Sequence, residues 1–182
     1  MEKKSVKLKD GTPVSGDVFG VQEYEKLKML YRKWVDINSD LKILGGRKMN
    51  VPDVLSEGLY CYFFDAVRTN GTAHSYDAVD ENTGEGIQVK AGSVETDCTS
   101  FGPTSTWDRL IFLDFASTGE IDGKVLFYEI GCEDVYGIVV NKTKGETFAD
   151  QQAQGRRPRF SVKKKIIQEK KLVPIKKIDL EE

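Results

Sequence analysis

The residues of this chain best suited to chemistry are an aspartate and a Gln-x-Lys pair, separated by a short polar turn. Asp77 lies in one predicted strand, and Gln88 and Lys90 lie in the next. The turn between them, residues 80–86, is rich in Gly, Asn and Asp, which indicates a β-hairpin. Side chains two apart on a strand share a face, so Gln88 and Lys90 should point the same way, close to Asp77. The two strands are expected over residues 74–79 and 87–91.

Such a cluster could hydrolyse a phosphodiester bond. The reaction needs an activated water, charge stabilisation at phosphorus and help for the leaving oxygen, and a hard divalent cation held by oxygen ligands can supply all three. We expect Asp77 to be the central metal ligand, Gln88 to bind through its amide oxygen or a water, and the Val89 carbonyl to add a further ligand. Lys90 would orient the water and stabilise charge on the phosphate. Because these ligands are oxygens with no Cys or His pair, the expected cofactor is Mg²⁺, with Mn²⁺ as a substitute.

A second carboxylate is expected to reach this cluster from a helix. Asn50 and Pro52 are typical of a helix start, and the segment 53–67 that follows is apolar almost all round, which predicts a buried helix. Glu57 is conspicuous in it, because a buried carboxylate needs a partner or a metal. Glu57 could hold a water or a second metal ion; the alternative is an edge position paired with a surface Arg or Lys.

The remaining pattern predicts a single α/β domain over residues 1–182, with residues 1–18 and 170–182 peripheral or partly mobile. An amphipathic helix is expected over 19–38, and two strong strands over 110–116 and 124–130. Three later segments are less defined: 132–140, which could be helical, 144–155, a loop or short helix, and 157–167, a strand or a strand leading into a helix.

Composition excludes several classes of protein. The chain has 182 residues, 39% hydrophobic and 31% charged, which suits a globular domain. No apolar run approaches the roughly 18 residues of a membrane span, and the start has no signal-like region, so we expect a cytoplasmic protein that does not bind membranes. The three cysteines are widely spaced and predict neither disulfides nor zinc. The single histidine, His74, is expected to start a strand rather than act as a base.

Charge is unevenly distributed along the chain. Residues 1–50 carry 11 Lys and Arg against 7 Asp and Glu, residues 51–155 carry 6 against 18, and residues 156–182 carry 10 against 4. An acidic middle flanked by basic ends suits a metal-binding centre with phosphate-contacting arms. Ordinary solvated charge runs are the alternative interpretation.

Five segments occur in an order that resembles the small type II restriction endonucleases that cut the interrupted site GC-N-GC, members of the PD-(D/E)xK superfamily. The segments are 46–57, 75–77, 87–91, 99–108 and 155–161. The resemblance covers roughly residues 20–175. It implies a central mixed sheet flanked by helices, and a magnesium-dependent endonuclease that makes double-strand breaks, usually as a homodimer beside a protective DNA methyltransferase.

By position, Asp77, Gln88 and Lys90 match the catalytic signature of these enzymes, and Glu57 matches its helical acid. Gln88 is a departure, because this position is usually an acid, and the change puts metal affinity in doubt. Three alternatives follow: a catalytically weak or inactive DNA-binding protein of the same fold, a repair or nicking nuclease without a strict site, and an interaction module unrelated to DNA.

Candidate DNA contacts flank the cluster. Arg is the usual bidentate reader of guanine in the major groove, and hydroxyl groups suit contacts to the DNA backbone. The candidates are Arg47, Lys48, Ser100, Thr104, Ser105, Thr106, Arg156, Arg157 and Arg159. For the dimer interface, the candidate is the helix around Tyr24 and Trp34, whose aromatic side chains look exposed.

Overall fold

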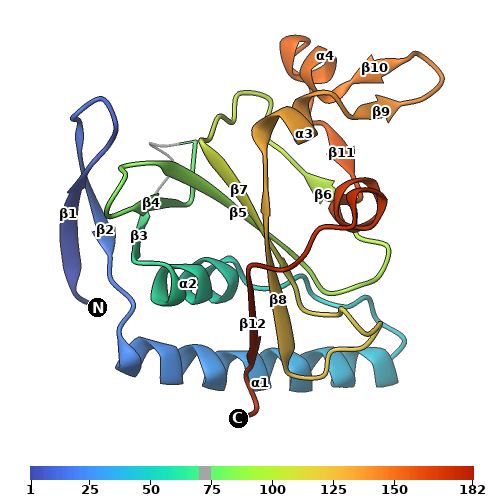
Figure 1. The fold of residues 1–182 in the computed structure, drawn as a ribbon. Coiled ribbons are helices and arrows are strands. Elements are labelled where there is room, and N and C mark those ends of the chain that lie inside the picture. The colour runs from blue at the N-terminus through green and yellow to red at the C-terminus, as the bar shows by residue number, and fades with distance from the viewer. Residues whose placement is uncertain (70–74) are drawn as a thin grey trace.

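The hairpin predicted around Asp77 lies at the centre of an eight-stranded mixed sheet in the computed structural model (Figure 1). The structure describes residues 1–69 and 75–182, so the expectation for His74 falls outside the described residues. The strand order is β1-β2-β3-β4-β5-β7-β8-β12, with β5 and β7 parallel and every other neighbouring pair antiparallel. The strands are β1 (Lys3–Lys7), β2 (Pro13–Asp17), β3 (Ala66–Thr69), β4 (Ala78–Asp80), β5 (Gly86–Gly92), β7 (Arg109–Asp114), β8 (Lys124–Ile130) and β12 (Lys176–Asp179).

Both faces of this sheet are covered, as the alternating side chains of β7 show. Ile111 and Leu113 pack in one apolar cluster with the helices α1 (Val21–Ile43) and α2 (Asp53–Phe63). Leu110 and Phe112 pack in a second cluster, as expected for side chains that alternate along a strand. Figure 1 shows α1 along the lower end of the sheet, with α2 lying between α1 and the hairpin strands. The expected α/β architecture, a mixed sheet flanked by helices, is confirmed.

The second cluster is covered by short elements from the C-terminal half of the chain. They include two small ribbons, one pairing β6 with β11 and the other pairing β9 with β10. Their aromatic side chains, among them Phe101, Trp107, Phe148 and Phe160, interlock above the sheet. These elements are β6 (Thr99–Ser100), α3 (Cys132–Tyr136), β9 (Val139–Asn141), β10 (Glu146–Thr147), α4 (Phe148–Ala153), β11 (Arg159–Phe160) and the π-helix η1 (Lys163–Gln168).

The first predicted helix is confirmed and runs on to Ile43, but its aromatic side chains are not exposed. Tyr31 and Trp34 are each 2% exposed and pack against Phe115. Their helical spacing reflects the stripe that faces the sheet. The expectation that the aromatic side chains are exposed is therefore wrong for Tyr31 and Trp34, which belong to the core, whereas Tyr24 is half-buried. The assignment of this helix to a dimer interface stays a prediction.

The second predicted helix ends earlier than expected. α2 stops at Phe63, and Asp65 adopts a left-handed conformation (φ 45°) that turns the chain into β3. Ala66 and Val67, assigned to the helix from their apolar character, are strand residues. A short apolar run does not distinguish a buried helix from a buried strand, which explains the error.

Both ends of the chain lie at edges of the main sheet. Residues 1–18 and the tail from residue 170 were both expected to be peripheral or partly mobile. Residues 1–18 supply β1 and β2, and the tail supplies β12 beside β8. Ile178 and Leu180 are two apart, share a face and pack on the α1 and α2 side, with Leu180 fully buried. This apolar packing holds the highly charged tail against the edge of the sheet. Within the described ranges, no helix combines the length and the apolar character needed to cross a bilayer.

Candidate active site in a cleft beside the β4–β5 hairpin

Asp77 is held against β5 by main-chain and side-chain donors. It lies directly before β4, where its N–H donates to the Ile87 carbonyl at 2.8 Å. Its Oδ2 accepts from the Val89 N–H at 2.8 Å and from Nε2 of Gln88. In a strand the N–H and C=O of one residue leave the same side, so the Val89 carbonyl also faces the strand that carries Asp77.

A polar cleft of about 410 Å³ opens beside this carboxylate, between the start of α2 and the end of β5. Asp77, Val89 and Lys90 line it from the hairpin, and Glu57 lines it from α2. The sequence interpretation placed these four residues together, and the structure brings them together. Further lining residues include Lys48, Asp53, Ser93, Asp97, Thr99 and Ser100.

Electrostatics in the cleft favour a bound cation. Burial raises the pKa of Asp77, an effect opposed by the positive charge of Lys90 and by the Val89 N–H. Burial also raises the pKa of Glu57, and the negative charge of Asp77 raises it further. Two partly desolvated carboxylates that repel each other are stabilised by positive charge between them.

Glu57 forms the pairing with an Arg that the sequence offered as one interpretation; its role toward a water or a second metal ion stays a prediction. Its Oε2 pairs with Nε of Arg68 on β3 at 2.5 Å, which is the predicted pairing with an Arg, and it still lines the cleft. The Arg68 charge lowers the pKa of Glu57 but does not cancel the effect of burial. Glu57 is thus held by one partner while it faces the cleft.

Gln88 and Lys90 differ in exposure although they share a face of β5. Gln88 is 4% exposed, lies behind Asp77 and does not line the cleft. Lys90 is half-buried, lines the cleft, and its Nζ lies 5.9 Å from the centre of the Phe101 ring. Among the described residues, no ion pair involves Lys90, so its ammonium is available to the cleft.

The candidate DNA contacts are only partly gathered at the cleft. Lys48 and Ser100 line it, and Arg159 is the β11 neighbour of Ser100 in the small ribbon. Arg156 is instead paired with Glu146, its Nη2 lying 2.6 Å from Oε2. The others do not line the cleft: Arg47, Thr104, Ser105, Thr106 and Arg157.

Two aspartates of the cleft were missed from the sequence. Asp53 lies one helical turn before Glu57, and its charge raises the pKa of both Asp77 and Glu57. The i,i+4 spacing of two acids on one helix could have indicated it. Asp97 is buried, and its carboxylate accepts from Ser161 Oγ at 2.5 Å and from the Val162 N–H at 3.0 Å. Nothing in the local sequence indicates that long-range contact.

The donor set suits a hard cation held partly by main-chain and water oxygens. Within the part of the chain that the structure describes, no group of three or more His, Cys, Asp or Glu side chains is arranged to hold a metal. Asp77, the Val89 carbonyl and Glu57 offer oxygens only, which is the ligand chemistry of Mg²⁺, an ion that retains several waters.

Comparison with known proteins decides the family. The model of the Bsp6I restriction endonuclease family matches residues 19–169. The chain belongs to the Bsp6I restriction endonuclease family. It is 37% identical over 160 residues to the type II restriction enzyme Bsp6I of Bacillus sp. (strain RFL6), covering 86% of this chain and 88% of that relative. No solved structure matches the chain significantly.

Membership of the Bsp6I family confirms the resemblance derived from the ordered segments and identifies the chain as a nuclease. The match contains the whole cleft, from Lys48 to Ser100, and the β11 strand. The mixed α/β sheet is consistent with the PD-(D/E)xK-like fold of restriction endonucleases. The alternative of an interaction module unrelated to DNA is not supported by this family.

Proposed function

We propose that this protein cuts both strands of DNA at a GC-rich palindrome such as GC-N-GC, by metal-dependent phosphodiester hydrolysis in the cleft beside the β4–β5 hairpin. The observation that carries the proposal is the convergence of Asp77, the Val89 main chain, Lys90 and Glu57 on one cleft within a restriction endonuclease family. The choice of site rests on the resemblance of the ordered segments, which are those of enzymes cutting GC-N-GC.

Asp77, the Val89 carbonyl and Glu57 would hold Mg²⁺, or Mn²⁺ in its place, together with waters. Bound there, the ion would lower the pKa of a water and neutralise charge on the phosphate. Asp77 is poised for this role because two donors on β5 fix its carboxylate. Gln88 keeps Asp77 in place through its amide NH₂ group. Because Gln88 is buried and does not line the cleft, its amide oxygen would reach the ion through a water.

Lys90 is the catalytic residue proposed to orient the attacking water. It faces the cleft from β5, the strand whose Val89 N–H donates to Asp77, and its charge interacts with the Asp77 carboxylate. An ammonium group in a partly desolvated cleft stabilises developing negative charge more strongly than one in water. Glu57, fixed by Arg68, would accept a hydrogen bond from the same water or would coordinate a second ion.

DNA recognition is assigned to the margin of the cleft. Lys48 and Ser100 would contact phosphates next to the cut, and Arg159, beside Ser100 on the ribbon, is the proposed guanine reader. Arg157 is exposed on the segment leading into that ribbon. Contacts from Arg47, Thr104, Ser105, Thr106 and Arg156 would lie farther out along the duplex.

Assembly and partners follow from the symmetry of the substrate. A palindromic duplex is two-fold symmetric, and the chain holds one Asp77–Lys90 cleft, so a homodimer that cuts one strand per subunit is the simplest arrangement. Cutting the host's own DNA would be lethal, which implies a methyltransferase that protects the same site. Because both enzymes act on host and incoming DNA, we place the protein in the cytoplasm.

A digest tests the function directly. Unmethylated plasmid DNA incubated with the protein and Mg²⁺ should yield defined fragments whose mapped ends share GC-N-GC, and plasmid methylated at those sites should remain intact. The matched control is the same digest with excess chelator, in which no cutting is expected. Smeared products would favour a nuclease without a strict site, nicked circles alone a nicking enzyme, and full cutting in chelator would refute metal dependence.

A further inference from the structure

A short arm projects from the body of the molecule next to the β6–β11 ribbon. It consists of residues 139–153, which form β9, the turn to β10, and α4. Figure 1 shows the arm extending beyond the upper end of the main sheet, on the side where β6 and β11 lie. The catalytic cluster does not include any residue of the arm, so its role is not explained by catalysis.

The tip of the arm carries positive charge that the arm itself does not neutralise. Lys142 and Lys144 lie exposed in the turn between β9 and β10, and neither takes part in an ion pair among the described residues. The two acids of the arm are engaged at its base. Glu146 is paired with Arg156, and Asp150 accepts from the Thr147 N–H at 2.8 Å as part of the cap of α4.

The interaction of Glu146 with the tip is weaker than its interaction with Arg156. The pKa of Glu146 is lowered, chiefly by the hydrogen bond from Arg156 and only to a smaller degree by the charge of Lys144. The two lysines therefore project a largely uncompensated charge into solvent.

The base of the arm is firmly attached to the body. Phe148, the first residue of α4, is fully buried, and its ring meets Phe101 at 5.2 Å and Tyr136 at 5.5 Å between ring centres. Gln152 of α4 donates to the carbonyls of Gly102 at 3.0 Å and Ser105 at 3.2 Å. A charged tip on an anchored base loses little conformational freedom when it binds.

The arm is continuous with the margin of the cleft. Ser100 lines the cleft on β6 and pairs with Arg159 on β11, and the chain segment before β11 joins α4 through the exposed Arg157. Exposed Arg157 and Arg159 therefore lie at the ribbon, and exposed Lys142 and Lys144 lie at the tip of the arm beside it. Cations at both places have the sign that contact with a DNA backbone requires.

We propose that the β9–β10 arm docks on the sugar–phosphate backbone of the substrate duplex outside the recognition sequence, with Lys142 and Lys144 as its phosphate contacts. The inference rests on the proposed function, since it takes duplex DNA as the ligand. Lysine ammonium groups act as point charges toward phosphate, so the arm increases affinity without reading bases. Its contribution belongs to binding of flanking DNA, not to choice of the site.

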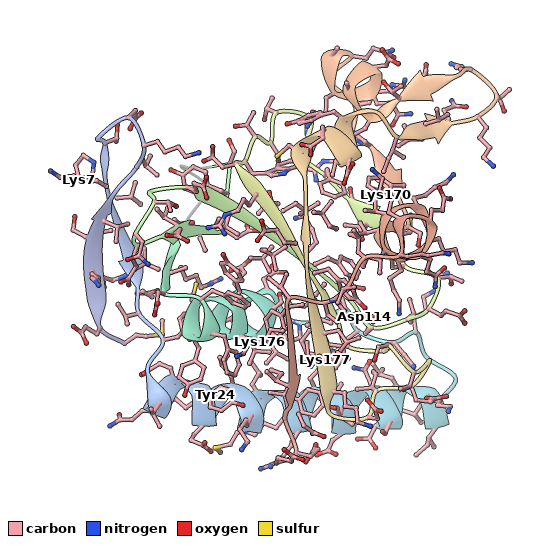
Figure 2. The ribbon with its side chains drawn as sticks, in the orientation of Figure 1. Lys7, Tyr24, Asp114, Lys170, Lys176 and Lys177 are labelled. Carbon is pink, nitrogen blue, oxygen red and sulfur yellow. The ribbon has the colours of Figure 1, made fainter. Side chains whose placement is uncertain are left out.

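The test compares two double variants in binding to a long duplex that carries the site, with Ca²⁺ in place of Mg²⁺. Lys142→Ala with Lys144→Ala should weaken binding roughly tenfold at about 0.1 M salt and reduce the slope of log affinity against log salt by about 2. The control is Lys7→Ala with Lys177→Ala, which removes two exposed lysines far from the arm (Figure 2) and should leave the affinity and the slope unchanged. Arg at both arm positions should retain wild-type binding.

Duplex length separates the arm from the cleft. On a short duplex that ends just outside the recognition sequence, the wild-type protein and the arm variant should bind equally. If the wild-type protein and the arm variant also bind the long duplex equally, with the same salt slope, the proposed role of the arm is wrong. A wild-type protein that neither binds nor cuts plasmid DNA would overturn the proposed function, and the arm with it.

Discussion

Gln88 donates from Nε2 to Oδ2 of Asp77, so the carboxamide at the second position of the proposed catalytic signature contacts the carboxylate at the first. Two acids at these positions would repel each other until a cation arrived. The amide instead stabilises the charged form of Asp77, partly offsetting the burial that raises its pKa. The departure from the usual acid therefore has a local function in the metal-free enzyme.

The Gln88→Glu protein is expected to remain able to cleave DNA. Its cleavage rate and its stability should both depend more strongly on the Mg²⁺ concentration than those of the wild type. The new carboxylate restores the commoner ligand but places a second negative charge beside Asp77. Titration of cleavage rate and melting temperature against Mg²⁺ and Mn²⁺ measures both effects, with Gln88→Met as the control that has neither charge nor donor. Loss of cleavage at every metal concentration would show that the amide NH₂ group is required.

Asp77→Ala and Lys90→Ala are each expected to reduce cleavage by at least about 10²–10³-fold while DNA binding persists. The Asp77→Ala protein would lack the central metal ligand, and the Lys90→Ala protein would lack the charge that faces the cleft. Binding should persist because most affinity comes from phosphate contacts elsewhere. Single-turnover cleavage and a gel-shift assay on the same preparations separate the two quantities. A Lys90→Ala protein that cuts at near the wild-type rate would remove Lys90 from the mechanism.

The raised pKa values of Asp77 and Glu57 predict a pH-dependent instability of the metal-free protein. A carboxyl group whose pKa is higher in the folded state binds more protons there than in the unfolded chain. Its contribution to the free energy of unfolding is then present at acidic pH and is lost as pH rises through the folded pKa, above the ordinary value of about 4.

Asp77→Asn should remove one of these two titrations, so the variant should gain stability over the wild type as pH rises toward neutrality. Denaturant unfolding in chelator at a series of pH values measures the difference, and Mg²⁺ should reduce it by binding the wild type. If the difference in free energy of unfolding between the variant and the wild type stays constant with pH, Asp77 is not the source of the pH-dependent loss of stability.

Local sequence features were sufficient for the hairpin and the helical acid. The turn at 80–86 and the spacing of Gln88 and Lys90 indicate the β4–β5 hairpin, although β4 begins only at Ala78 and Asp77 precedes it. Asn50 and Pro52 indicate the start of α2, where Pro52 is the N-cap and no side chain caps the helix. Long-range pairings were not accessible in this way. Ser100 meets Arg159, and Asp97 meets the start of η1, through contacts that no local pattern encodes.

Misassignments arose where composition and environment disagree. Ala66 and Val67 continue the apolar run of α2, and only the left-handed turn at Asp65 separates the helix from β3. The tail around Ile178 was expected to be peripheral, and it is an edge strand, but its pairing with β8 was not foreseen because lysines surround it. An edge strand with one buried face needs few apolar residues, so composition alone underestimates it.

Asp114→Ala is expected to destabilise the protein by about 3–5 kcal/mol, because it leaves a buried ammonium without its counter-ion. Asp114, labelled in Figure 2, ends β7, and its Oδ1 lies 2.9 Å from Nζ of Lys163, with both side chains almost fully buried. Lys163 also donates to the Ala116 carbonyl at 2.9 Å, which ties η1 to the sheet.

The double variant Asp114→Leu with Lys163→Met should recover most of that stability, since replacing both charges leaves no unpaired ion. Urea unfolding of the two variants and the wild type measures the free energies. If the double variant is no more stable than Asp114→Ala, the pair contributes through shape or the Ala116 contact, not through the cost of an unpaired charge.

A homodimer on DNA is the last expectation, and an interface formed by α1 would have to use residues other than the buried Tyr31 and Trp34. Tyr31 and Trp34 are core residues, so Tyr31→Ala or Trp34→Ala would lower stability without informing on assembly. Light scattering of the wild type with a duplex carrying one site should give two chains per duplex, and a single 20.5 kDa chain alone on the site would contradict the dimer. Mixing wild type with excess Asp77→Ala protein supplies a second readout. If each subunit cuts one strand, mixed dimers should nick the site in place of breaking it, whereas a monomer that cuts the strands in turn would still produce double-strand breaks, only more slowly.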